Sequence, residues 1–239
     1  MNEAEIELAA RLADLEGRIG RAAARAGRSA AEVAIVAVSK RHPIDRIAAA
    51  CRAGVTRVGE NYAQELASKM DALAGDPACA ALGWHFIGRL QRNKVRLVVG
   101  RVALIHAVDS IELAREIARR AGERGLVQPI LVAVSAAGET QKTGVDPDRV
   151  GALLDEVAGL ASLECRGLMT MPPWPERPED SRRYFRDLRE IRDRLAAPDR
   201  PLPDLSMGTT GDLEVAVEEG ATLVRVGTAL FGPRPGSPG

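Results

Sequence analysis

Residues 33–61 read VAIVAVSKRHPIDRIAAACRAGVTRVGEN, and this stretch contains a complete strand–helix–strand unit. An apolar run at 33–39 is followed by a helix-like segment from Pro43 to Gly54 and by a second apolar run at 57–61. Similar β-rich runs recur at 84–88, 103–110, 129–135, 163–171, 203–208 and 222–231, with helix-like stretches between most of them. Eight such runs in one chain of 239 residues predict an α/β protein with the TIM (β/α)8 barrel fold. A doubly wound open sheet is the alternative that this pattern leaves open.

An extra helix is predicted before the first strand. Residues 3–26 place apolar side chains at roughly helical spacing, at Ile6, Leu8, Leu12, Leu15 and Ile19. No long linker divides the chain, so we expect a single barrel domain over residues 1–232 and a disordered tail over 233–239. The proline-rich stretch MPPWPERPED follows the sixth strand and is expected to form a loop on the carboxyl face of the barrel, where barrel active sites lie.

The composition excludes several classes of partner. Lys plus Arg and Asp plus Glu both number 33, so the chain has no net charge to attract nucleic acid or an anionic membrane. No apolar run approaches the roughly 20 residues that cross a bilayer, and the acidic, amphipathic N-terminus does not read as a signal peptide. The three cysteines form no CxxC pair, so neither a metal site nor a disulfide framework is indicated. These features predict a cytoplasmic protein without metal, nucleic acid or membrane partners.

Lys40 closes the first strand and is the strongest candidate for chemistry. Ala34, Val36, Val38 and Lys40 share one face of the strand, so the lysine continues an apolar face at the carboxyl end of a barrel strand. Partial desolvation there would lower the pKa of the amine and make it available for a Schiff base. The alternative is that Lys40 only marks the end of the strand and reaches solvent.

The last two strands suggest an anion site. Arg225 interrupts the apolar eighth strand, and a buried guanidinium needs an anion or several acceptors. Gly227 and Thr228 follow it, and residues 208–211 form a turn of small residues before a helix. Loops after strands 7 and 8 commonly bind phosphate in TIM barrels, so we expect a phosphate here. Helix capping alone is the alternative explanation for Thr210.

Polar residues also follow the second, third and fifth strands. Asn61 ends the second strand beside Glu60 and could be explained by turn or cap chemistry. The third strand carries His85, which we interpret as a buried core histidine, and leads to Arg89. Lys142 follows the fifth strand, where a solvated charge is the simpler explanation. From the residues alone, a lysine facing a phosphate site leaves two candidates, a sugar-phosphate aldolase and a pyridoxal phosphate protein.

Six motifs then occur in an order that resembles one known family. They are AVSK (37–40), GENYAQE (59–65), WHFIGRLQRNK (84–94), GLMTM (167–171), LSMG (205–208) and VRVGTALFG (224–232). In this respect the chain resembles the pyridoxal phosphate homeostasis protein family, which is similar to the N-terminal barrel domain of alanine racemases. The resemblance extends from about residue 5 to residue 232.

The resemblance implies a fold-type III barrel that binds pyridoxal 5′-phosphate (PLP). Lys40 matches the lysine that forms the Schiff base, and Asn61 matches the asparagine beside the cofactor. The remaining cofactor-binding positions implied are Ser206, Gly208, Thr210, Arg225, Gly227 and Thr228, with Arg225 either near the phosphate or facing the pyridine ring. Lys142 matches a loop lysine of the family. The chain departs from the family in SMGTT for SMGMS, in His42 for a second lysine and in Arg89 for His or Pro.

The function implied is that of a carrier and regulator of PLP in the cytoplasm, with no established reaction of its own. Its partners would be PLP and PLP-dependent apoenzymes, and we expect a monomer. The first rival function is that of a racemase, which needs two acid–base groups. The second group of alanine racemases is a tyrosine from a further domain, and neither Tyr62 nor Tyr184 matches it. A cofactor-free Schiff-base aldolase is the second rival function, and an interaction scaffold is the third.

Overall fold

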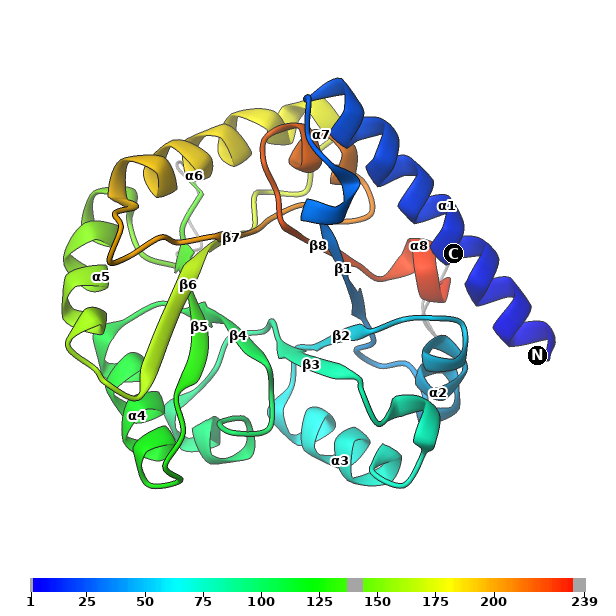
Figure 1. The fold of residues 1–239 in the computed structure, drawn as a ribbon, viewed down its shortest axis with the longest axis horizontal. Helices are drawn as coiled ribbons and strands as arrows, with labels where there is room; N and C mark the ends of the chain where they lie inside the picture. The colour runs from blue at the N-terminus through cyan, green and yellow to red at the C-terminus, as the bar shows by residue number, and fades with distance from the viewer. Residues whose placement is uncertain (1, 137–143, 234–239) are drawn as a thin grey trace.

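A computed structural model describes residues 2–136 and 144–233 of the chain. Its strands lie in a ring surrounded by helices, as Figure 1 shows. In the described residues the strands are β1 (Ala34–Val38), β2 (Arg57–Glu60), β3 (Gly83–Phe86), β4 (Leu104–Val108), β5 (Gln128–Val134), β6 (Leu163–Thr170), β7 (Asp204–Ser206) and β8 (Leu223–Val226). They pair in parallel in chain order, and β8 pairs with β1 to close the barrel. The predicted TIM barrel is confirmed, and the open sheet is excluded.

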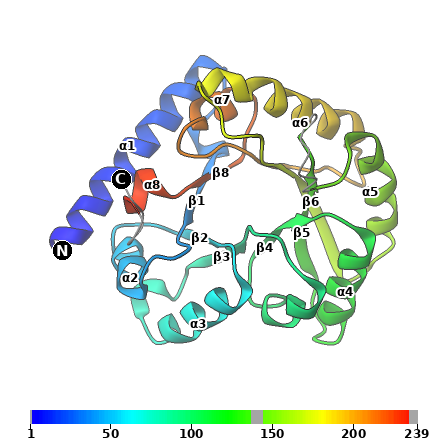
Figure 2. The same cartoon turned by 180° about the vertical axis from the view of Figure 1, so that it is seen from behind.

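The helices cover the outside of this ring in both views (Figures 1 and 2). The α-helices of the described part are α1 (Glu3–Arg25), α2 (Ile44–Arg52), α3 (Ala63–Leu73), α4 (Ile111–Gly122), α5 (Val150–Ala158), α6 (Arg182–Leu195), α7 (Leu213–Glu218) and α8 (Thr228–Phe231). Short 3-10 helices occur at η1 (Ala30–Glu32), η2 (Pro77–Cys79), η3 (Arg92–Leu97), η4 (Pro147–Arg149) and η5 (Pro178–Ser181).

Two apolar layers hold the fold together. One lies between the outer face of the strands and the helices, and the other fills the inside of the barrel. The inner layer contains Val36, Ile87, Leu131, Met169 and other apolar side chains. Because side chains alternate along a strand, the same strands supply residues to both layers. The side chains that face inward at the carboxyl ends of the strands surround the mouth of the barrel.

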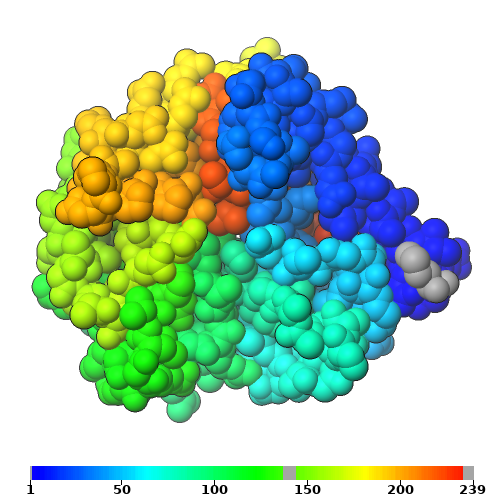
Figure 3. Space-filling view, viewed as in Figure 1, coloured from blue at the N-terminus to red at the C-terminus, as the bar shows by residue number. Residues whose placement is uncertain are grey.

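Helix α1 begins at a capping box. The Asn2 side chain accepts a hydrogen bond from the Glu5 amide at 3.0 Å, and the Glu5 carboxylate accepts one from the Asn2 amide at 2.9 Å. Leu8 and Leu15 are buried where the helix packs against α2, α7 and α8. The predicted helix is confirmed, although Ile6, one of the apolar residues that indicated it, is 58% exposed. Helix α1 packs against α7 and α8, near the other end of the described chain. In the space-filling view, part of the blue N-terminal region borders an orange-red segment (Figure 3).

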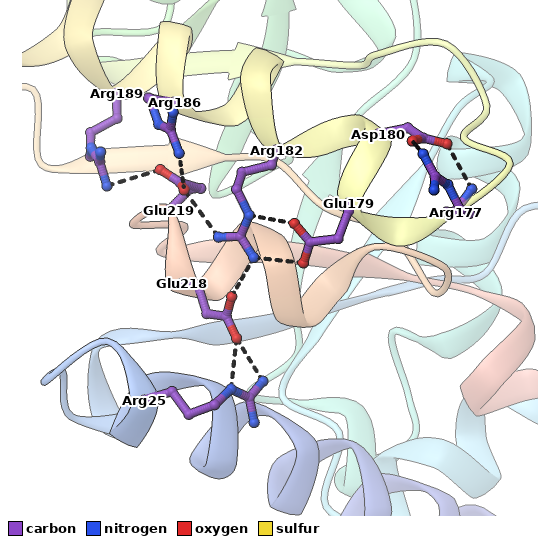
Figure 4. Close-up of polar contacts among 9 residues, drawn as sticks. All are labelled: Arg25, Arg177, Glu179, Asp180, Arg182, Arg186, Arg189, Glu218 and Glu219. Atoms are coloured by element: carbon purple, nitrogen blue, oxygen red, sulfur yellow. Dashed lines mark hydrogen bonds and ion pairs between the residues drawn. The ribbon is translucent and has the colours of Figure 1, made fainter.

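An ion-pair network joins α1, α6 and α7, as Figure 4 shows. Arg182 donates to Glu179 at 2.6 Å, to Glu218 at 2.6 Å and to Glu219 at 3.1 Å, and Glu218 also binds Arg25 at 2.7 Å. Glu219 is almost fully buried and has two further arginine partners, Arg186 and Arg189. The network therefore ties the outer helices beside the seventh and eighth strands to one another.

The eighth strand is shorter than its apolar run suggests. The run 222–231 was predicted as strand, but β8 ends at Val226 and the short helix α8 follows from Thr228. Gly227 turns the backbone between them, with φ −107° and ψ −81°. Most of the predicted tail lies outside the described residues. In the part of the chain that is described, no helix combines the length and apolar character needed to span a membrane.

Candidate functional site

Lys40 lies two residues beyond β1 and is half-buried. It continues the inward alternation of Val36 and Val38, which belong to the inner layer or pack against it. The backbone around it is hydrogen-bonded on both sides, since the Ser39 amide donates to the Gly59 carbonyl at 3.1 Å and the His42 amide donates to the Ser39 carbonyl at 3.0 Å. The lysine therefore stands on an ordered turn at the mouth of the barrel, as the strand pattern predicted.

Asn61 follows β2 at the same edge of the barrel. Its side-chain oxygen Oδ1 is buried and has no hydrogen-bond partner among the described residues. The cap interpretation is wrong, because Tyr62 occupies the N-cap position of α3 and Asn61 Oδ1 bonds none of the described helix amides. A Cβ on Gly88 would lie 2.2 Å from the Asn61 carbonyl oxygen, so only glycine allows β3 to leave the barrel this close to Asn61. A buried acceptor without a partner at the mouth of a barrel fits a ligand with a donor group.

Arg225 lies inside the barrel. Its guanidinium donates to Ser206 Oγ at 2.6 Å and to the Thr170 carbonyl at 2.9 Å. Burial lowers the pKa of Arg225 to about 10, opposed by the Asp212 carboxylate, so the side chain keeps its charge at neutral pH. The need for several acceptors, inferred from the sequence, is met by these groups of the protein itself.

A chain of hydrogen bonds continues from Arg225 through the barrel. His106 Nδ1 lies 2.9 Å from Ser206 Oγ, and His106 Nε2 lies 2.8 Å from His85 Nδ1. Burial, with the Arg57 charge, lowers the pKa of His85 to about 4, and burial with the His85 and Arg225 charges lowers that of His106 well below its ordinary value. Both rings are therefore neutral at pH 7. His85 is the buried core histidine that we expected, but its partners could not be read from the sequence.

The turn after β7 approaches the start of α8. Gly208 has φ +87°, and a Cβ there would lie 2.4 Å from the Ala216 Cβ, so the turn requires glycine. The Thr209 amide donates to Asp212 Oδ1 at 2.7 Å, which commits both residues to the turn itself. Thr210 Oγ1 accepts a hydrogen bond from the Ala229 amide at 3.4 Å and so joins this turn to α8. In the described structure, Thr210 therefore bonds an amide of α8 and not one of its own turn.

The structure brings these predicted residues together in two groups. Gly208, Thr210, Gly227 and Thr228 lie where the turn after β7 meets α8, and Thr228 is exposed there. Ser206, another of the implied cofactor-binding positions, is the last residue of β7 and is fully buried, bonded to Arg225 and His106.

Comparison with known proteins agrees with this geometry. The family described as alanine racemase, N-terminal domain, matches residues 11–235. The pyridoxal phosphate homeostasis protein of Aquifex aeolicus (strain VF5) is 45% identical over 225 residues, covering 94% of this chain and 97% of the relative. That of Escherichia coli (strain K12) is 35% identical over 95% of this chain and 97% of the relative. The chain belongs to the pyridoxal phosphate homeostasis protein family.

Solved structures extend the comparison. PipY of Synechococcus elongatus PCC7942, solved with PLP bound, is 36% identical to this homeostasis-family chain, with a TM-score of 0.82 over 94% of this chain and 100% of PipY. An alanine racemase of Clostridium difficile 630 is 15% identical, with a TM-score of 0.73 over 97% of this chain and 58% of the racemase. That second likeness concerns the barrel fold alone.

The three departures from the family pattern noted in the sequence can now be placed in this homeostasis-family protein. His42 is buried and stacks on Phe231, with ring centroids 4.9 Å apart. Arg89 is exposed and lines an open groove of about 800 Å³ next to Asn61, together with Arg92 and other polar side chains. Thr210 keeps a hydroxyl at the turn after β7. Lys142 lies outside the described residues.

Sequence reasoning missed a buried ion pair in this homeostasis-family protein. Glu60, the residue before Asn61, is fully buried, and its carboxylate lies 2.7 Å from the ammonium of Lys69 on α3. The signal in the sequence was a lysine on the apolar stripe of that helix, between Leu66 and Leu73. Within the described residues, no group of three or more His, Cys, Asp or Glu side chains is arranged to hold a metal ion.

Proposed function

We propose that this protein binds PLP through Lys40 and holds it in reserve for PLP-dependent apoenzymes, as a carrier that keeps the free aldehyde low. The observation that carries the proposal is the half-buried Lys40 at the mouth of the barrel, beside an Asn61 oxygen without a partner in the described structure. The proposal is supported by family membership and by the relative PipY, whose structure was solved with PLP bound.

The residues present fit the cofactor. Lys40 would form the Schiff base, in which its amine nitrogen bonds to the aldehyde carbon and one water is released. Asn61 Oδ1 would accept a hydrogen bond from the cofactor. Thr210, Gly227 and Thr228 would hold the phosphate through hydroxyl and backbone N–H groups. When bound, PLP supplies an aldehyde and an electron-withdrawing ring.

Arg225 would serve the ring rather than the phosphate. Arg225 is two residues before the turn at Gly227. Its guanidinium points into the barrel, where it donates hydrogen bonds to Ser206 and to the Thr170 carbonyl. A guanidinium can donate hydrogen bonds but cannot accept them, so next to the pyridine nitrogen it would favour the unprotonated ring. An unprotonated ring is a weak electron sink, and this supports a carrier more than a catalyst.

A racemase remains the alternative activity, and its requirements are poorly met in the described residues. It needs a second acid–base group opposite Lys40, and a missing group of this kind costs about 10²- to 10⁴-fold in rate. Tyr62 is 48% exposed, and Tyr184 lies on the outer helix α6 beside Arg183. We expect negligible conversion of L-alanine to D-alanine by the loaded protein, measured by chiral chromatography. Turnover of about 1 per second or faster would restore the racemase.

The test of the proposed function is the visible absorbance of the protein loaded with PLP. Borohydride should fix the cofactor to a single peptide, and the sequence has only four lysines, at positions 40, 69, 94 and 142. Lys40→Ala should abolish both the absorbance band and the fixed adduct, while Lys94→Ala keeps them. An adduct on another lysine in Lys40→Ala would show that the assignment is wrong.

The phosphate assignment has its own variant. Thr228→Val removes a hydroxyl and should weaken PLP binding by about 1–3 kcal/mol, because a charge-assisted hydrogen bond is lost. If the affinity, measured by titration with PLP, is unchanged, the assignment of the phosphate site to the start of α8 is wrong.

A further inference from the structure

A cluster of charged side chains lies behind Lys40, between helix α3 and the carboxyl ends of β1 and β2. We name it the Lys69 cluster, and its members are Ser39, Glu60, Glu65 and Lys69. Val38 and Gly59 are register partners, and a Cβ on Gly59 would meet inner-layer side chains. The residues that follow them, Ser39 and Glu60, therefore face the opposite side, toward α3.

The ammonium of Lys69 has an acceptor for each of its three donors. Nζ lies 2.7 Å from the Ser39 carbonyl oxygen, 2.7 Å from Glu60 Oε1 and 2.6 Å from Glu65 Oε1. Ser39 Oγ also donates to Glu60 Oε1 at 2.6 Å. Ser39 and Glu60 are fully buried, and Lys69 is 5% exposed. Because all three N–H donors of the ammonium are hydrogen-bonded, the side chain of Lys69 is held in one orientation.

Both peptide groups next to Lys40 are bonded to this cluster. The Ser39 carbonyl accepts from Lys69, and the Arg41 amide donates to Glu65 Oε1 at 2.6 Å. Arg41 has φ +63°, a left-handed conformation that a residue with a side chain rarely adopts. A strained residue persists when its surroundings hold it, and Glu65 supplies such a contact at the residue next to Lys40. Helix α3 therefore sets the path of the backbone through Lys40.

Stability alone is a weak reason for this arrangement. Burial raises the pKa of Glu60, opposed by its bonds to Lys69 and Ser39, and its second oxygen Oε2 has no hydrogen-bond partner among the described residues. A buried ion pair costs much of its attraction in desolvation, and apolar side chains of the same size would often serve the fold as well. What apolar side chains could not do is bond the two peptide groups beside Lys40.

We propose that Lys69 and Glu65 are positioning residues, which hold the backbone of residues 39–41 so that the Lys40 amine meets the aldehyde of the bound cofactor. This inference rests on the proposed function. A displacement of about 1 Å in a reacting group can cost on the order of 10²-fold, so a small shift of this turn should affect Schiff base formation strongly. It should not affect the sites for the ring and the phosphate.

The experiment compares PLP with pyridoxine 5′-phosphate, which has the same ring and phosphate but no aldehyde. Glu65→Ala should weaken the capture of PLP, followed by the visible band, by roughly 10-fold or more. Its affinity for pyridoxine 5′-phosphate, measured by calorimetry, should stay within twofold of wild type. Glu65→Gln keeps an oxygen that accepts from the Arg41 amide and should restore most of the capture. The matched control is Glu116→Ala, since Glu116 is also ion-paired on a helix, with 22% side-chain exposure against 24% for Glu65.

A second variant removes the buried charges in balance. Lys69→Met combined with Glu60→Gln removes the two buried opposite charges together, while Glu65, whose side chain is 24% exposed, keeps its bond from the Arg41 amide, so the barrel should fold. The double variant loses the bond from Lys69 to the Ser39 carbonyl, so it should lose PLP capture selectively as Glu65→Ala does. Equal losses for both ligands in either variant, or wild-type capture in either, would overturn the positioning role. If the wild-type protein forms no visible band, the proposed function fails and this inference fails with it. If the wild-type band forms and Glu65→Ala is unchanged, only the inference fails.

Discussion

The hydroxyl of Ser206 joins the buried charge of Arg225 to the buried histidines, and Ser206→Ala tests how much the barrel depends on it. The substitution removes a charge-assisted bond of 2.6 Å from Arg225 Nη1 and a bond of 2.9 Å to His106 Nδ1. A bond to a charged group contributes about 1.5–3 kcal/mol and a neutral one about 0.5–1.5 kcal/mol. Serine and alanine differ little in volume, so no cavity adds to the loss. We expect Ser206→Ala to lower the free energy of unfolding by about 2–4 kcal/mol.

The assay is urea unfolding of the protein without added cofactor, followed by circular dichroism. The slope of the unfolding free energy against urea should not change, and the midpoint should fall. Thr170→Val is the matched control, because it removes a buried hydroxyl with one neutral bond, to the Val134 carbonyl at 3.0 Å, and should cost about 1 kcal/mol. The reasoning would be refuted if Ser206→Ala lowered the free energy of unfolding by less than about 0.5 kcal/mol, or by no more than Thr170→Val does. Either result would mean that the Ser206 hydroxyl does not stabilise the buried charge of Arg225.

Three further outcomes follow from the described contacts. His85 has a pKa of about 4 in the folded state and 6.5 as its ordinary value, so the unfolded state binds more protons below pH 6.5. Stability present above pH 6.5 should therefore be lost as the pH falls toward 4, by up to about 3 kcal/mol for this residue, and urea midpoints that stay flat from pH 7.5 to 5 would contradict this. Arg182→Ala leaves the buried Glu219 with fewer partners and should cost about 1–3 kcal/mol in thermal unfolding, whereas Arg177→Ala, at an arginine 81% exposed, should show no measurable change. Gly88→Ala should push Asn61 aside, lower stability by about 1–3 kcal/mol and weaken PLP binding; wild-type affinity would mean that the two segments separate freely.

Local patterns were sufficient to predict the barrel. Each strand is an apolar run with a period of two, each helix carries its own apolar stripe, and eight such units leave few parallel arrangements. The position of Lys40 was predicted from the same signal, because the alternation of side chains along β1 places that of Lys40 on the inner face of the barrel. The error at residues 222–231 has a local cause as well. An apolar segment of that length is compatible with a strand or a short buried helix, and the turn at Gly227 decides between them.

The partners of the buried polar groups depended on the tertiary structure. Ser206 bonds His106, which lies 100 residues away in the sequence, and Lys69 bonds a carbonyl 30 residues away. Sequence spacing carries no information on such pairs, because they depend on strand register, on barrel closure and on the direction of each side chain. The alternation of apolar residues thus determined the fold and the position of the lysine. Only the tertiary structure decided that Arg225 bonds groups of the protein and that helix α3 holds the backbone beside Lys40, because a hydrogen bond requires its two atoms within about 3 Å in three dimensions.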